Sequence, residues 1–195
     1  MTVFGWLATF GVCDRMRSVP ASVRWLRMSP QGLAQRLPSL GSVLYLARRE
    51  GEGAAEAVPA AGVLAESMDL TPLLHTHWLH AASTVTAEGP REWIECRDAR
   101  GETLARLYLL PDTDYLAWDA LLGDGTPCPA PALRERRARF HAMRARLLCF
   151  SHRRLAGLSA FGCAGAPRIS PIGRRLAQDI ARSEAVALDA VPACG

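Results

Sequence analysis

The sequence contains no lysine and no asparagine, so all 23 of its basic residues are arginine. Lysine and asparagine are both encoded by A-rich codons, and their joint absence indicates a GC-rich genome before it indicates a function. The arginine excess is therefore weak evidence for nucleic-acid binding. The formal net charge of +4 is also modest and does not select a class of partner.

Long hydrophobic runs are scarce. The one apolar run at the N-terminus, residues 2–13, is much shorter than the roughly 20 residues that a membrane helix needs. No basic residue precedes the run, whereas Arg15 and Arg17 follow it, which reverses the order of a signal peptide. We therefore predict a cytoplasmic protein without a membrane span, in which residues 1–22 form a separate apolar segment.

Cysteine pairs with metal-binding or redox spacing are also missing. Six cysteines are present, and none belongs to a C-x-x-C motif. The simplest expectation is reduced thiols. Cys96 falls within an expected strand and is predicted to be a small core residue. Cys128 precedes Pro129 in an expected linker, where the thiol would be reactive or ligating only if its surroundings lowered its pKa.

The chain is long enough and apolar enough to bury one core, with 195 residues of which 49% are hydrophobic. Ser29 and Pro30 predict the start of a short helix, and Gly41 precedes an expected strand at residues 42–47. That strand is apolar at successive positions, so we expect it to be buried on both faces. Residues 50–62 are predicted to be a loop, and residues 68–85 are ambiguous between helix and strand.

Two further strands, at residues 93–97 and 103–110, flank a turn at Asp98-Ala99-Arg100-Gly101. A helix follows, in which Tyr115, Trp118 and Leu122 recur on one face. The fold class predicted from these segments is α+β, an antiparallel sheet with helices packed on one side.

Beyond this unit the composition changes. Residues 123–131 read as a proline-rich linker, residues 132–156 as a basic amphipathic helix, and residues 157–195 as a loose tail with a short helical pattern near 172–187. Phe140, Met143, Leu147 and Phe150 recur every three or four residues in the expected basic helix. Such a stripe needs cover, so a homodimer is a reasonable prediction. The arginines of this helix could neutralise phosphates, but no nucleic-acid motif accompanies them, and we favour a solvated surface.

The predicted segments form an ordered series that resembles a known family. It reads Leu37-Pro38-Ser39-Leu40-Gly41-Ser42-Val43, then Arg48-Arg49-Glu50, Met68-Asp69-Leu70, the hairpin, and Thr113, Asp114, Trp118, Leu121 and Leu122. In order and spacing it resembles one repeat of the cytoplasmic haem-trafficking and hemin-degrading proteins of Gram-negative bacteria, over about residues 23–122. The resemblance favours strand for residues 68–85. No second repeat is present in the sequence.

The resemblance implies haem as cofactor and partner, and a role in haem or iron acquisition. It does not supply the ligand, because the family's axial histidine lies in the second repeat, and Thr71 stands where the family has an arginine after L-D-L. The candidate ligands are the five histidines, His75, His77, His80, His141 and His152. Arg48, Arg49 and Arg106 are candidates to pair with the propionates. Before Pro129, Cys128 also resembles the Cys-Pro pair of regulatory haem sites.

Two alternatives remain open. The spacing His75-x-His77-x-x-His80 is similar to that of metallo-β-lactamase-like hydrolases, although Leu79 stands where those enzymes have a metal-binding aspartate. The histidines could equally do no more than solvate an exposed strand. A degenerate relative that binds no haem and acts through its basic helix is the other alternative. The sequence does not plainly provide the ligand and electron supply that haem degradation needs, so binding is favoured over catalysis.

Overall fold

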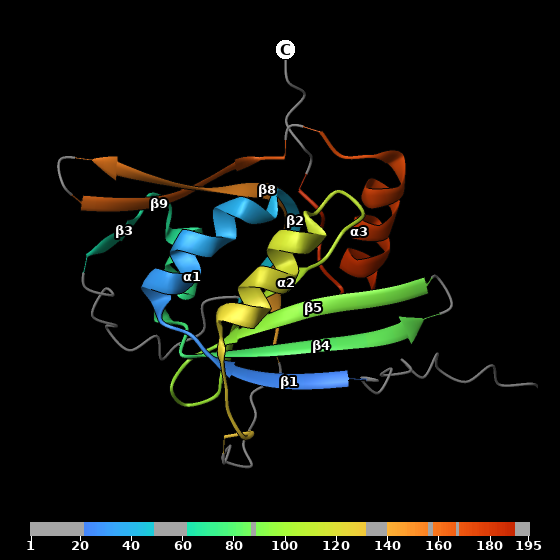
Figure 1. Ribbon diagram of the computed structural model, residues 1–195. Helices are drawn as coiled ribbons and strands as arrows, with labels where there is room; N and C mark the ends of the chain where they lie inside the picture. The colour runs from blue at the N-terminus through green and yellow to red at the C-terminus, as the bar shows by residue number, and fades with distance from the viewer. Residues whose placement is uncertain are drawn as a thin grey trace, which may run out of the picture.

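The computed structural model describes residues 22–48, 62–86, 89–131, 140–155, 158–166 and 168–189. Nine strands form one sheet in the order β3-β9-β8-β2-β6-β5-β4-β1-β7 (Figure 1). The strands are β1 (Ser22–Arg27), β2 (Ser42–Arg48), β3 (Val63–Ala65), β4 (Trp78–Thr86), β5 (Gly89–Arg97), β6 (Thr103–Tyr108), β7 (Thr126–Pro127), β8 (Ala142–Leu155) and β9 (Leu158–Gly165). All pairs are antiparallel except β3 with β9. The predicted α+β class is confirmed.

The helical elements are α1 (Pro30–Arg36), the 3-10 helices η1 (Leu37–Leu40) and η2 (Met68–His75), α2 (Tyr115–Asp124) and α3 (Pro171–Ser183). Helix α1 begins as predicted, because the Ser29 hydroxyl accepts a hydrogen bond of 3.1 Å from the amide of Gly32. Gly41 ends η1 with a φ of 67°, a conformation that favours glycine. None of these helices is long and apolar enough to span a membrane.

The β5–β6 hairpin and α2 form as predicted. Gly101 has a φ of 81°, and the Asp98 carboxylate accepts hydrogen bonds from the amides of Arg100 and Glu102 at 2.9 and 2.8 Å. Asp114 caps α2 by accepting from the amide of Ala117. Capping and turn chemistry therefore determine where these elements begin.

The sheet is covered on both faces, whereas helices were expected on one. Helices α1, η1, η2 and α2 cover the face that carries Val43, Tyr45 and Leu107, and Trp118 is buried there. Helix α3 covers part of the other face, where Leu44 and Leu46 are buried. Below, these are called the α2 face and the α3 face. Strand β2 is buried on both faces, as predicted.

The predicted basic helix at residues 132–156 is wrong for the part that the structure describes. Residues 142–155 form β8, which lies between β2 and β9. Leu147 packs on the α3 face and Leu148 and Phe150 on the α2 face, so the apolar stripe does not exist as one surface. The homodimer stays a prediction, but its stated physical basis is lost.

Two other predictions need correction. Residues 68–75 form the 3-10 helix η2 rather than a strand, because the Ser67 side chain caps its start and Pro72 cannot donate to a sheet. The tail is not loose over its described part, since β9 and α3 lie within it. The helical pattern near 172–187 is confirmed by α3. The N-terminal segment 1–21 and most of the expected loop, residues 49–61, lie outside the described residues.

Candidate functional site

One row of side chains crosses the α3 face through four strands. Trp25 is paired with His80, His80 with Glu95, and Glu95 with Arg106. Residues directly opposite each other in an antiparallel pair point to the same side of the sheet. The register therefore places an aromatic ring, an imidazole, a carboxylate and a guanidinium side by side.

Glu95 is the centre of this row, and its side chain is 6% exposed. Its carboxylate contacts Nδ1 of His80 at 3.1 Å and accepts from Nε of Arg106 at 3.0 Å and Nε of Arg97 at 3.1 Å. Burial alone would raise the pKa of Glu95. The hydrogen bond with His80 and the charges of Arg106 and Arg97 outweigh burial, and they lower the pKa to about 2. Glu95 is therefore a carboxylate at any physiological pH.

Arg106 connects this centre to α3. Its Nη1 donates to both carboxylate oxygens of Glu184 at 2.8 Å. Tyr108 also donates to Glu184, and burial together with the Glu184 charge raises the pKa of the Tyr108 hydroxyl. Arg106 therefore lies between two carboxylates and forms an ion pair with each.

Aromatic rings and guanidinium groups surround the row. The rings of Trp25 and His80 lie 4.5 Å apart, and the Arg97 guanidinium is 5.4 Å from the Trp25 ring. On the same side of β1, Arg27 lies 4.6 Å from the ring of its partner Trp78. We call Trp25, Arg27, Trp78, His80, Glu95 and Arg97 the His80 cluster.

The cluster has the chemistry of a histidine prepared for a metal. When one ring nitrogen is hydrogen-bonded to a carboxylate, the tautomer and orientation are held and the other nitrogen is left to coordinate. In His80, Nδ1 contacts Glu95, so Nε2 is the atom that can ligate. The His80 side chain is 15% exposed, which leaves the ring partly accessible.

The other candidate histidines lie apart from His80. His75 is the last residue of η2, and His77 precedes β4 with its ring 4.7 Å from that of Trp78. His141 precedes β8 and is exposed, and His152 is paired with Phe161 on β9. Within the described ranges, no three His, Cys, Asp or Glu side chains are grouped to hold a metal ion. His75, His77 and His80 do not lie together on one exposed strand, so that alternative was wrong. The hydrolase hypothesis has no set of metal ligands among the described residues.

Two of the three arginines predicted to bind propionates already form ion pairs within the protein. Arg48 pairs with Glu102 at 3.0 Å, Arg106 pairs with Glu95 and Glu184, and Arg49 is outside the described residues. Sequence reasoning missed Arg27. The position of Arg27 beside Trp78 depends on the pairing of β1 with β4, and β1 had not been predicted as a strand.

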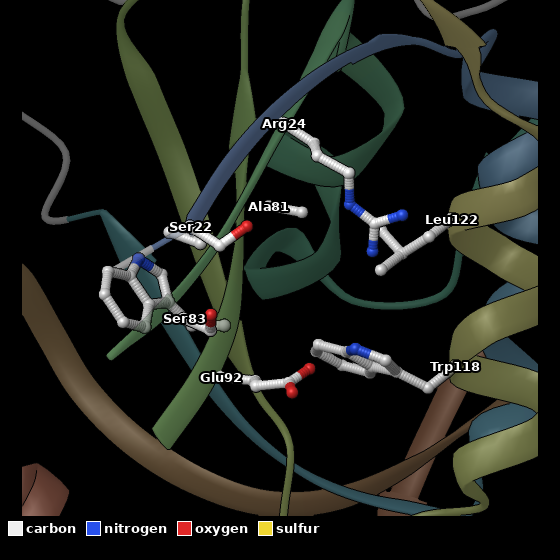
Figure 2. A pocket seen from close by; sticks show the side chains of 9 residues that line it. Ser22, Arg24, Ala81, Ser83, Glu92, Trp118 and Leu122 are labelled. Atoms are coloured by element: carbon white, nitrogen blue, oxygen red, sulfur yellow. The ribbon is translucent and has the colours of Figure 1, made fainter. Parts of the chain in front are cut away.

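Two hollows lie near β1. One has a volume of about 210 Å³ and lies on the α2 face between β1, β4, β5 and α2 (Figure 2). The other has about 470 Å³, lies along the outer edge of β1, and includes Trp25 and Cys128 in its lining. Neither includes His80.

The predicted burial of Cys96 is confirmed, and burial raises the pKa of its thiol to about 12.

Comparisons with known proteins give solved structures alone, since no protein-family model and no curated protein matches. The haem-degrading enzyme ChuS of Escherichia coli O157:H7 is 18% identical with a TM-score of 0.43, over 61% of this chain and 40% of that one. Holo-PhuS, a haem-binding protein of Pseudomonas aeruginosa, is 25% identical with a TM-score of 0.40, over 60% and 38%. The chain thus spans about 40% of the length of these proteins. The likeness expected from the sequence is found, over part of the chain.

Proposed function

We propose that this chain is a cytosolic haem-binding protein that handles haem in bacterial haem or iron acquisition. The proposal starts from the sequence resemblance, whose expectations for the Gly41 turn, the β5–β6 hairpin and the start of α2 agree with the structure. The observation that supports a specific haem ligand is the hydrogen bond between His80 and the buried carboxylate of Glu95.

His80 is the axial ligand that the geometry favours. Among the five candidate histidines, it is the one with a carboxylate held against Nδ1, as ligating histidines commonly have. The carboxylate would increase the electron density on the ring and hold its orientation. Trp25 and Trp78 provide flat apolar surface beside it, which suits a porphyrin.

Arg27 is the guanidinium we assign to a propionate. It is exposed, lies on the same face as His80, and has no ion-pair partner among the described residues. A guanidinium fork can bind a carboxylate through two hydrogen bonds. Arg97 and Arg106 are instead committed to Glu95, and their role is to hold the carboxylate that orients His80.

Bound haem would provide a coordinating iron and a redox-active macrocycle, while the protein provides the ligand, its orientation and the charge around it. We propose binding and transfer rather than ring cleavage.

Titration with hemin tests the proposal. The purified protein should shift the Soret band and saturate at stoichiometric hemin. His80→Gln keeps a hydrogen-bonding side chain beside Glu95 but removes the ligand, and should weaken hemin binding at least about tenfold, as losses at metal-ligand shells do. His141→Gln is the matched control and should bind as the unaltered chain does. An unchanged Soret band at micromolar protein would remove the proposed function, and equal binding by His80→Gln would remove the assigned ligand.

A further inference from the structure

The hollow on the α2 face lies where the apolar core ends. Arg24, Ala81 and Ile94 form one cross-strand row, and Ser22, Ser83 and Glu92 form the next row toward the rim. Ala81 and Ile94 are buried in the core, whereas the rim row is entirely polar. Trp118 and Leu122 on α2 line the opposite wall, as Figure 2 shows. The result is a small polar chamber of about 210 Å³ closed on one side by the core.

Trp118 provides an unsatisfied donor at this chamber. The residue is 2% exposed, and its indole Nε1 has no hydrogen-bond partner among the described residues. A buried donor left without an acceptor destabilises the folded chain. No group in the described part of the chain accepts from this N–H, so an acceptor on a ligand in the chamber could pair with it.

Two opposite charges reach into the same chamber. The Arg24 guanidinium and the Glu92 carboxylate both line it and point inward in Figure 2. Within the part of the chain that the structure describes, neither is in an ion pair. A single small anion would satisfy Arg24 and Trp118 but would be repelled by Glu92. A ligand with a negative and a positive group satisfies all three.

We propose that this chamber is a binding site for a free amino acid. The ligand carboxylate accepts hydrogen bonds from Arg24 and from Nε1 of Trp118, and its ammonium group donates to Glu92. The hydroxyls of Ser22 and Ser83 border the polar end. The volume suits a small molecule and excludes a tetrapyrrole, since sites for drug-sized ligands have about 300–1,000 Å³.

The site is separate from the proposed haem site. Arg24 alternates along β1 with Trp25, so the chamber opens on the α2 face and the His80 cluster on the α3 face. Either can be lost without the other.

The indole N–H resonance of Trp118 in a ¹⁵N-labelled full-length chain, assigned with Trp118→Phe, reports on the chamber directly. A mixture of free L-amino acids, and then single members, should shift this resonance and saturate at millimolar ligand. Acetate and methylamine, which each carry half of the ligand, should bind at least about tenfold more weakly, as expected when one charged contact is lost. No shift of the Trp118 resonance with any amino acid would overturn the proposal.

Charge variants test the assigned contacts. Arg24→Gln should abolish the shift with both amino acids and acetate. Glu92→Gln should remove the preference for amino acids over acetate. Arg100→Gln, at an exposed arginine of the β5–β6 turn that does not line the chamber, is the control and should titrate as the unaltered chain does. Binding that persists in Arg24→Gln, or equal affinity for acetate and amino acids in the unaltered chain, would contradict a zwitterion site. Hemin titration of the same variants keeps this outcome distinct from failure of the proposed function.

Discussion

The hydroxyl of Tyr108 donates a hydrogen bond of 2.6 Å to the carboxylate of Glu184, across 76 residues of sequence. Tyr108 ends β6 and Glu184 caps the C-terminal end of α3. Arg106 donates to the same carboxylate, so a polar clamp fastens α3 to the sheet. The clamp also reaches Glu95 through Arg106, and it therefore joins the docking of α3 to the orientation of His80.

Tyr108→Phe should lower the free energy of unfolding by about 1.5–3 kcal/mol, the range for a hydrogen bond to a charged group. The substitution removes one donor to Glu184 and leaves the apolar ring in place. Urea denaturation followed by circular dichroism measures the change. Tyr115→Phe, on an exposed residue of α2, is the control and should change the midpoint little. Equal midpoints for the two variants would show that the hydrogen bond from Tyr108 to Glu184 contributes nothing to stability.

The stability of the chain should fall in acid through Glu95. Its pKa in the folded state is about 2, below its ordinary value of 4.5, so the ionised form is stabilised by folding. The contribution is fully present above about pH 4.5 and is lost as the pH falls toward 2. Its size is about 3 kcal/mol, since each pKa unit corresponds to about 1.4 kcal/mol. Urea midpoints measured from pH 7 to pH 3 test this dependence.

Glu95→Gln is the variant for that measurement. It should be less stable than the unaltered chain at pH 7 by about 3–5 kcal/mol, because Arg97 and Arg106 lose a buried partner. Its stability should also depend less on pH between 5 and 3. Glu92→Gln, which changes a partly exposed carboxylate outside any described ion pair, is the control. A pH dependence that is identical in Glu95→Gln and the unaltered chain would exclude Glu95 as the titrating group.

Thr113 should be intolerant of losing its hydroxyl. The hydroxyl donates to the carbonyl of Ser42 at 2.6 Å and accepts from the amide of Leu110 at 2.9 Å, and the residue is 4% exposed. Thr113→Val keeps the shape but leaves two buried backbone groups unpaired, which should cost about 2–4 kcal/mol. Thr113→Ser keeps the hydroxyl and should cost clearly less. Thermal unfolding of both variants makes the comparison, and a larger loss in Thr113→Ser would contradict it.

Native-state alkylation should separate the cysteines. Cys96 is fully buried, and burial raises the pKa of its thiol to about 12, so it should react only after unfolding. Cys128 is partly exposed and should be alkylated in the native protein. Peptide mapping by mass spectrometry after treatment with iodoacetamide, with and without urea, measures both. Equal modification of Cys96 and Cys128 without urea would mean that the core opens readily.

Local chemistry made much of the fold predictable. The start of α1 follows from Ser29 and Pro30, the turn after η1 from Gly41, and the start of α2 from Asp114. Each signal acts within a few residues, so it can be recognised without knowing what lies next to it in space. Thr113 was noted only as a position in the family pattern, and the structure adds its bonds to Leu110 and Ser42.

Strand β8 could not be recognised in this way. A strand in the interior of a sheet is buried on both faces, so the alternation of apolar and polar residues that identifies a half-exposed strand is lost. Leu147 and Leu148 are both buried, and the remaining spacing of Met143, Leu147 and Phe150 imitates a helix. The arginines of β8 bind acidic residues that are distant in sequence, as Arg146 binds Asp69. A local sequence pattern cannot predict such a contact.

The candidate site was predictable only as a set of residue types. His80 stood among five histidines with nothing to distinguish it until the β4–β5 register brought Glu95 opposite. Arg106 was expected to pair with a propionate, and in the structure it pairs with Glu95 and Glu184. Register and the position of α3 are long-range features, and the sequence alone left them open.

The interior position of β8 also has a consequence for biosynthesis. Strand β2, finished early in translation, keeps one hydrogen-bonding edge open until residues near 149 emerge from the ribosome to pair with it. The nascent chain therefore exposes an unpaired, apolar strand edge while about half of its residues are synthesised, which makes protection by chaperones valuable. Any stop codon or protease cut between α2 and β8 should yield inclusion bodies rather than a smaller working protein.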